Sequence, residues 1–144
     1  SKYNRSDDDI QEAVNKWYDD PVEATVEYGH ISKWNTSLVT NMKRLFLYKR
    51  TFNDDISKWN VSSVTNMEDM FYRARFFNGD ISGWNVSSVT NMEFMFSNSQ
   101  FDGDISGWKI ENCCKTYEMF DGCPIQEEHK PIGVNQIHSM NGNY

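Results

Sequence analysis

A unit of about 25 residues recurs through the middle of the chain and limits what it can fold into. It runs from Ile31 to Asp55, from Ile56 to Asp80 and, one residue shorter, from Ile81 to Asp104, and it fades over residues 105–123. Tandem units of this length are typical of repeat proteins, in which each unit buries its apolar face against its neighbours. We therefore predict a solenoid, and a surface for binding rather than a catalytic pocket.

The first half of a unit has the apolar spacing of a leucine-rich repeat. In the second copy this spacing is set by Ile56, Trp59, Val61 and Val64. It predicts a short strand over residues 57–61 with Trp59 and Val61 turned inward. Lys58 and Asn60 are then left on the outer face.

The second half of a unit has a helical spacing. Met67, Met70, Phe71 and Ala74 lie at i, i+3, i+4 and i+7, which is one stripe of a short helix. Thr65 and Glu68 have the spacing of a capping box for that helix. The prediction is an α/β solenoid, a leucine-rich-repeat-like coil of about four strand-turn-helix repeats of 24–25 residues.

Aromatic residues return in register and make up 15% of the chain. Three rows are expected in the core: Trp34, Trp59, Trp84 and Trp108; Phe46, Phe71, Phe96 and Phe120; and Phe52, Phe77 and Phe101. Strands in a sheet lie about 4.8 Å apart, so rings of adjacent copies can touch.

The chain divides into three parts. Residues 1–30 do not repeat, and a stripe of Ile10, Ala13, Val14 and Trp17 followed by Pro21 and Gly29 predicts two helices that cap the first unit. Residues 31–123 are the repeat region. Residues 124–144 have no period and are expected to form an irregular C-terminal tail.

The repeat resembles a known family. Its pattern W-N-V-S-S-V-T-N-M-x-x-M-F, best seen from Trp59 to Phe71, is similar to that of the BspA-like leucine-rich-repeat surface proteins, also known as the DUF285 repeat family. The resemblance covers about residues 31–123. It implies a right-handed strand-and-helix solenoid, secreted or displayed on a cell surface, with roles in adhesion and protein binding and no catalytic residues.

Composition and motifs argue against several functions. The net charge of −7 disfavours nucleic acid as the main partner, and no apolar run of about 18 residues predicts a membrane span. Neither a phosphate-binding glycine motif nor a nucleophile beside a base is present, and His30, His129 and His138 lie outside the repeats. We expect no enzyme activity, cofactor or metal. Because the sequence begins at Ser1, we also consider a processed product from which a transit peptide has been removed.

The three cysteines, Cys113, Cys114 and Cys123, all lie in the last unit. Aligned on the repeat, Cys113 takes the place of Val64 and Val89, and Cys123 takes that of Ala74 and Ser99, so both are expected to face inward. Two alternatives remain open, a Cys113–Cys123 disulfide and two buried reduced thiols.

Two sets of polar residues could bind calcium or carry glycans, but each also has a simpler structural explanation. The turn acids Asp54, Asp55, Asp80, Asp102 and Asp104 offer calcium ligands, but aspartate is also an ordinary turn former. Four sequons begin at Asn4, Asn35, Asn60 and Asn85. Three of these are repeat consensus, so we expect Asn4 to be the freest glycosylation site.

Two surfaces are candidates for a protein or glycan partner. The strand face presents Lys58, Asn60 and Asn85, and the helix face presents Lys43, Arg44, Tyr48, Arg50 and Phe94. We predict a non-enzymatic protein-interaction or adhesion module, secreted or on the cell surface. The alternatives are a structural accessory subunit of a larger complex, such as one in an algal organelle, and a calcium- or glycan-binding protein.

Overall fold

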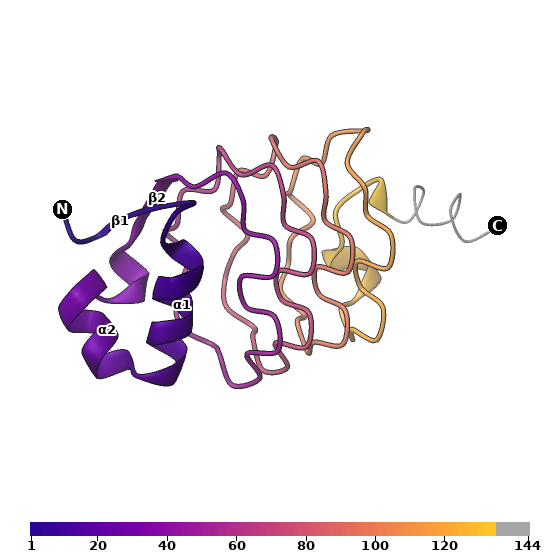
Figure 1. Ribbon diagram of the computed structural model, residues 1–144. Helices are drawn as coiled ribbons and strands as arrows, with labels where there is room; N and C mark the ends of the chain where they lie inside the picture. The colour runs from indigo at the N-terminus through magenta and orange to yellow at the C-terminus, as the bar shows by residue number, and fades with distance from the viewer. Residues whose placement is uncertain (135–144) are drawn as a thin grey trace.

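The fold was analysed in a computed structural model of the chain, which describes residues 1–134 (Figure 1). The element order is β1 (Asn4–Ser6), α1 (Ile10–Asp19), α2 (Pro21–Tyr28), the 3₁₀ turn η1 (Ile31–Lys33), β2 (Asn35–Leu38) and the 3₁₀ turn η2 (Glu127–His129). Both α-helices lie at the N-terminal end, where they cover the first repeat unit (Figure 1).

The two helices expected near the N-terminus are present. The apolar stripe of α1 is buried, with Ile10, Ala13, Val14 and Trp17 against the core. Pro21 begins α2 behind Asp20, whose carboxylate accepts a hydrogen bond from the Glu23 N–H, and Gly29 ends it with a φ of 77°. The short strand β1 pairs in parallel with β2 and fixes the N-terminus to the first unit.

The predicted fold class is wrong. Within residues 1–134 the structure has two α-helices and one two-stranded parallel sheet, so it is a small mixed domain and not a four-repeat strand-turn-helix coil. No repeat unit contains an α-helix, and only the first contains a strand of the sheet, β2. The units instead consist of irregular turns that lie side by side, as Figure 1 shows, and are joined by isolated parallel bridges from Asn41 to Asn66, Asn91 and Lys115 in turn.

Backbone geometry explains why the expected helices do not form. In the stripe from Met67 to Ala74, Asp69 and Arg73 have φ values of 56° and 55°, which interrupt a right-handed helix. The N–H groups of Met67, Asp69, Phe71 and Arg73 donate to carbonyls of the next unit instead of to carbonyls four residues back. The capping box is absent as well, since the Glu68 N–H is bonded to Asn66 Oδ1.

The predicted aromatic rows are confirmed. The rings of Phe46, Phe71, Phe96 and Phe120 follow one another at centroid distances of 5.3, 5.5 and 5.7 Å. Those of Phe52, Phe77 and Phe101 are 5.8 and 6.0 Å apart. Each tryptophan of the predicted row donates its indole N–H to an earlier backbone carbonyl, as from Trp59 to Ile31 at 2.9 Å. The core is therefore continuous from unit to unit.

The inward and outward assignments in the first half of a unit are also confirmed. Trp59 and Val61 are buried, whereas Lys58 and Asn60 are exposed. The backbone at residues 57–58 forms a turn, and the strand predicted for residues 57–61 is absent.

Candidate functional site

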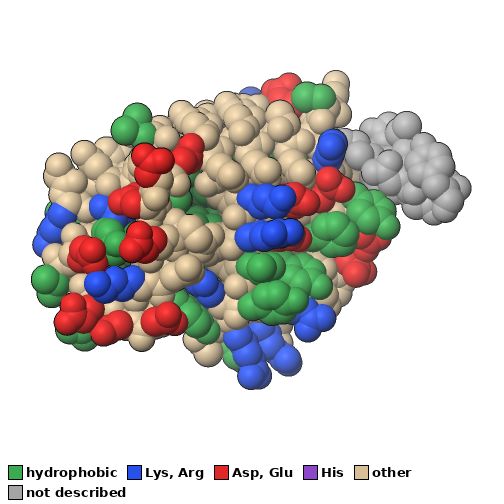
Figure 2. Space-filling view, in the orientation of Figure 1, with side chains coloured by type: hydrophobic (Ala, Val, Ile, Leu, Met, Phe, Trp, Pro, Cys, Tyr) green, Lys and Arg blue, Asp and Glu red, His purple; other side chains and the backbone are tan. Residues whose placement is uncertain are grey.

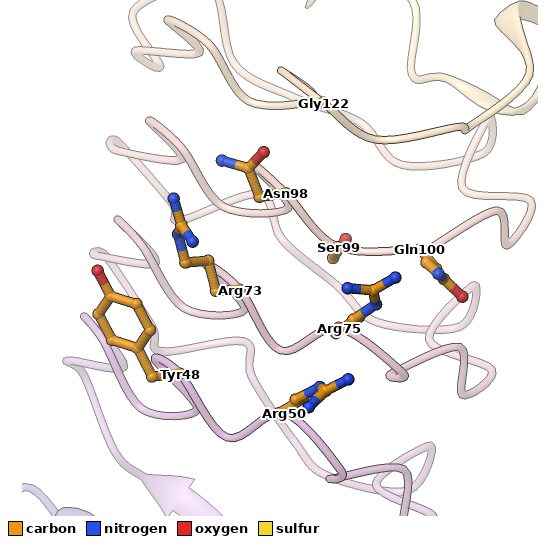
Figure 3. A pocket seen from close by; sticks show the side chains of 8 residues that line it. All are labelled: Tyr48, Arg50, Arg73, Arg75, Asn98, Ser99, Gln100 and Gly122. Carbon is orange, nitrogen blue, oxygen red and sulfur yellow. The ribbon is translucent and has the colours of Figure 1, made fainter.

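A groove of about 530 Å³ on the surface is lined by residues of all four units. We call it the arginine groove, and it is lined by Tyr48, Arg50, Arg73, Arg75, Asn98, Ser99, Gln100 and Gly122. Figure 3 shows Tyr48 and Arg73 near one end and Arg50 and Arg75 near the other. The space-filling view shows basic and hydrophobic side chains gathered over the middle of the molecule, whereas acidic ones crowd its helical end (Figure 2).

The repeat backbone positions these side chains. The N–H of Tyr48 donates to the Tyr72 carbonyl at 2.9 Å, and that of Arg73 donates to the Ser97 carbonyl at 3.1 Å. Further along, the Gln100 N–H donates to the Arg75 carbonyl at 3.0 Å. Equivalent residues of adjacent units are thereby held next to one another. Tyr48 and Arg73 are one such pair, and Arg50 and Arg75 are another.

Aromatic rings support all three guanidinium groups. Arg50 and Arg75 lie 5.6 and 5.8 Å from the centroid of the Phe76 ring, one on the unit before it and the other on its own unit. Arg73 lies 5.6 Å from the Tyr72 centroid and 5.9 Å from that of Tyr48. Such contacts fix the direction of an arginine and leave its N–H groups available to a ligand.

The charge of the groove is uncompensated within the described part of the chain. No aspartate or glutamate lines it, and no salt bridge in residues 1–134 involves its three arginines. The basic residues nearer the start of the units differ, since Lys43 pairs with Glu68 at 3.2 Å and Arg44 with Asp69 at 3.5 Å. The arginine groove is therefore a cationic site in an acidic chain.

A second, more open hollow of about 410 Å³ adjoins the groove and shares Tyr48 with it. Its lining includes Arg44, Tyr72 and Phe94. Phe94 is half-buried and packs edge-on against Tyr117, with centroids 5.7 Å apart. The second hollow is also lined by Glu68 and Asp69, so of the two only the arginine groove lacks carboxylates.

The structure unites only some of the residues predicted to bind a partner. Tyr48 and Arg50 lie in the arginine groove, and Arg44, Tyr48 and Phe94 lie in the adjoining hollow. Lys58, Asn60 and Asn85 line neither. Arg73 and Arg75 were not predicted, although their register signals them, because they lie 25 residues after the predicted residues Tyr48 and Arg50.

The turn acids serve the turns themselves. The carboxylates of Asp55, Asp80 and Asp104 each accept the N–H of the serine two residues later, at 2.9 to 3.0 Å. Hydrogen bonds from the serine side chain and backbone lower the pKa of all three. Residues 1–134 contain no group of three or more His, Cys, Asp or Glu side chains that could hold a metal ion. The expected calcium ligands are thus not brought together.

Asp54 and Asp102 have other partners. Asp54 accepts the indole N–H of Trp17 at 3.0 Å. Asp102 accepts the N–H of Gln126, and its carboxylate lies 3.1 Å from His129 Nδ1. Burial opposes the charged form of His129, but its hydrogen bonds with Asp102 outweigh this and raise its pKa. These contacts hold residues 126–129 to the third unit.

The sequon asparagines have a similar turn role. The Asn60 side-chain oxygen accepts both the N–H and the hydroxyl of Ser62, and Asn85 does the same with Ser87. Asn35 accepts the Ser37 N–H and donates to Asn4 Oδ1 at 3.2 Å. All four asparagines are exposed. The repeated sequon therefore has a structural reason to recur, and glycosylation stays a prediction.

All three cysteines are free thiols in the structure. The predicted alignment of the first is wrong, because Cys113 is exposed and Cys114 is buried. In the third unit the Val89 N–H donates to the Val86 carbonyl, and in the last unit the Cys114 N–H makes the equivalent bond to the Glu111 carbonyl. Glu111 follows its tryptophan by three residues and Val86 by two, so Cys114 and not Cys113 takes the buried position. Cys123 is half-buried, with Sγ 3.1 Å from the Phe101 carbonyl. Burial raises the pKa of both Cys123 and Cys114, the latter to about 11.

None of the helices formed by residues 1–134 has the length and apolar character needed to cross a membrane. The tail predicted for residues 124–144 is described up to Val134, and His138 lies outside the described residues. The three-part division of the chain stays a prediction.

Comparison with known proteins gives a family. The family model described as "Mycoplasma protein of unknown function, DUF285" matches residues 9–131. Neither a search of curated proteins nor one of solved structures gave a match. The match includes α1, α2 and all the repeat units. The chain therefore belongs to the DUF285 family.

Proposed function

We propose that the chain is a non-enzymatic protein-interaction module of the BspA-like type that binds an acidic segment of a partner protein in the arginine groove. We place this role in adhesion, outside the cell or at its surface. The observation that carries the proposal is the set of three ring-supported guanidinium groups with no carboxylate partner in residues 1–134.

The chemistry of the groove favours a carboxylate-bearing ligand. A guanidinium donates two parallel N–H groups to a carboxylate, and these charge-assisted bonds are about twice as strong as neutral ones. Rings beside Arg50, Arg73 and Arg75 reduce the freedom that each would lose on binding. The net charge of −7 makes such an unpaired basic group unusual for this chain.

The composition and spacing of the surface favour a polypeptide over another polyanion. Arginine, tyrosine and phenylalanine are enriched at protein–protein interfaces, and Tyr48, Tyr72, Phe76 and Phe94 accompany the arginines. Alternate side chains of an extended peptide lie about 6.6 Å apart. Phenylalanine rings of adjacent units lie 5.3 to 5.7 Å apart, about 1 Å less than this, so two alternate carboxylates of one peptide can reach Arg50 and Arg75 on adjacent units.

The direct test is binding of a fluorescent peptide of alternating glutamate and serine to the full chain, followed by anisotropy at low salt. The double variant Arg73→Gln/Arg75→Gln should weaken binding by about tenfold or more, equivalent to about 1.4 kcal/mol. The control Lys58→Gln removes one positive charge from another part of the surface and should leave the affinity unchanged. Binding should also weaken at about 0.15 M salt, because exposed charges are screened over about 8 Å.

Three results would overturn the proposal. Equal losses in the double variant and the control would show that only net charge matters. Binding of a sulfated polysaccharide at the same arginines, with no binding of the peptide, would make the ligand a glycan. Failure of both polymers to bind would remove the groove as a binding site.

The proposed location and independence of the module need a separate measurement. Protease added to intact source cells should remove the protein if it is displayed at the surface. Size exclusion of a native extract should show it apart from large complexes. Protection from the protease together with co-elution in a large assembly would instead favour the accessory-subunit alternative.

A further inference from the structure

The two ends of the row of units are finished differently. At the N-terminal end α1 packs against the first unit, and Gln11 Nε2 donates to the Leu45 carbonyl at 3.1 Å. At the other end the last unit, residues 105–123, has no further unit beside residues 116–122 in the described part of the chain (Figure 1).

Over residues 42–48 and the equivalent residues of the next two units, the hydrogen bonds between units run in one direction, although Thr65 and Gln100, outside this stretch, donate back to the preceding unit. In each of the first three units, four N–H groups at alternate residues donate to four alternate carbonyls of the next unit. The donors of the first unit are Met42, Arg44, Phe46 and Tyr48, and those of the third are Met92, Phe94, Phe96 and Asn98. The acceptors for the third unit are Lys115, Tyr117, Met119 and Asp121 in the last one. These donors therefore all face the same end of the molecule.

The last unit repeats the same donor positions without acceptors. They are the N–H groups of Thr116, Glu118, Phe120 and Gly122, which we call the donor edge. None of them has an acceptor among residues 1–134. Glu118 and Gly122 have φ values of 52° and 67°, like the left-handed residues at these positions in earlier units. The edge thus keeps the geometry in which three earlier rows of donors are paired.

A buried hydroxyl lies beside this edge. Thr116 is fully buried, and its Oγ1 has no hydrogen-bond partner in the described structure. It lines a cavity of about 130 Å³ together with Phe120, Lys130 and Val134. A buried hydroxyl left unpaired costs about 1–3 kcal/mol, so this feature independently marks a place where an acceptor or donor is missing.

We propose that the donor edge binds a partner protein by taking up an extended segment that presents backbone carbonyls at alternate residues, as a further unit of this repeat does. Extended segments added to an open edge gain affinity from main-chain hydrogen bonds. The occupant is a unit carried by another protein. A second copy of this chain does not fit end to end, because α1 covers its carbonyl edge at Leu45. Two donor edges cannot pair with each other.

The probe for this proposal is a synthetic peptide with the sequence of residues 56–80, added to the full chain. Amide hydrogen exchange followed by NMR should slow about tenfold or more at Thr116, Glu118, Phe120 and Gly122 when the peptide is in excess. A scrambled peptide of the same composition serves as the control. Amides lining the arginine groove outside the last unit should not respond, which separates this test from that of the proposed function.

A matched pair of variants tests the role of the hydroxyl. Thr116→Val keeps the shape of the side chain and should weaken binding of the peptide several-fold, whereas Thr25→Val, on the exposed face of α2, should not. The proposal is overturned if the four amides stay unprotected at the highest soluble peptide concentration, or if the scrambled peptide protects them equally. It is also overturned if they are already protected in the free chain, because the edge would then be occupied.

Discussion

The inward and outward positions of the repeat unit differ in how much they change between copies. The inward positions keep isoleucine, tryptophan and phenylalanine, which form continuous buried rows. One outward position reads Tyr48, Arg73 and Asn98 in the first three units, although the N–H group at this position donates to a carbonyl of the next unit each time. The backbone hydrogen bonds between units, which form a ladder, therefore fix where an outward side chain lies but not which residue it is.

Neighbouring outward positions show what this freedom allows. In one row Arg44 is followed by Asp69, and the two neutralise each other across 3.5 Å. In the row that begins with Tyr48, an arginine follows a tyrosine, and Arg50 and Arg75 add two more charges. The resulting charge is left for a ligand.

The largest expected effect tests the inward half of the comparison. Trp59→Ala should lower the free energy of unfolding by about 3–5 kcal/mol, because it leaves a cavity in the core and removes the indole hydrogen bond to the Ile31 carbonyl. Lys58→Ala, next to it but exposed, should change that free energy by no more than about 0.5 kcal/mol. Urea unfolding of both variants measures the difference, and similar losses would contradict the inward and outward assignment.

The positions of side chains were predictable from the sequence, whereas the backbone conformation was not. A period of 25 puts like residues on like neighbours, so the aromatic rows followed from spacing alone. Conformation within a unit did not, because the spacing of Met67, Met70, Phe71 and Ala74 suits a helix and also suits turns broken at Asp69 and Arg73. The spacing of apolar residues shows which side chains share a face. Here it was compatible with two backbone conformations, the predicted helix and the observed turns.

A smaller effect is expected at the end of the row of units, where an inward residue is polar. Thr116→Val should raise the free energy of unfolding by about 1 kcal/mol, because it replaces a buried hydroxyl that has no partner in the described structure. The equivalent positions of the earlier units hold methionine. A urea midpoint that falls in this variant would show that the hydroxyl is paired in the free chain.

The smallest effect concerns the exposed turns. Hydrogen bonds from Ser82 lower the pKa of Asp80 from its ordinary value of 3.8, and Asp55 and Asp104 are alike. A lowered pKa stabilises the fold above about pH 4, and this contribution is lost as the pH falls through the folded-state pKa. Asn60 makes the same turn without a titrating group. The triple variant Asp55→Asn/Asp80→Asn/Asp104→Asn should therefore lose less stability between pH 5 and pH 3 than the wild type.

Urea midpoints at the two pH values measure this loss. An equal drop in the wild type and the triple variant would show that these three turns do not contribute to acid sensitivity. Other carboxylates leave a residual drop in both proteins. At Asp7, for example, burial opposes the charged form, but hydrogen bonds from Thr40 and Asn41 outweigh this and lower the pKa.

The binding site was predicted only in part for a related reason. Tyr48 and Arg50 stood out because the first unit is locally basic, whereas Arg73 and Arg75 lie in a unit that also holds Glu68, Asp69 and Asp80. The local charge along the sequence does not reveal a cluster of arginines that comes together from neighbouring units. The pairing of Arg44 with Asp69 likewise depends on the ladder, which sequence composition does not report.

NMR of the full chain titrated with the peptide of alternating glutamate and serine tests most directly whether the outward arginines bind a ligand while the core stays unchanged. The side-chain Nε–H signals of Arg50, Arg73 and Arg75 should shift together, while the indole N–H signals of Trp34, Trp59, Trp84 and Trp108 stay in place. That result would locate binding in the outward positions and leave the inward ones as a scaffold. Shifts confined to other basic residues, or displacement of the indole signals, would contradict it.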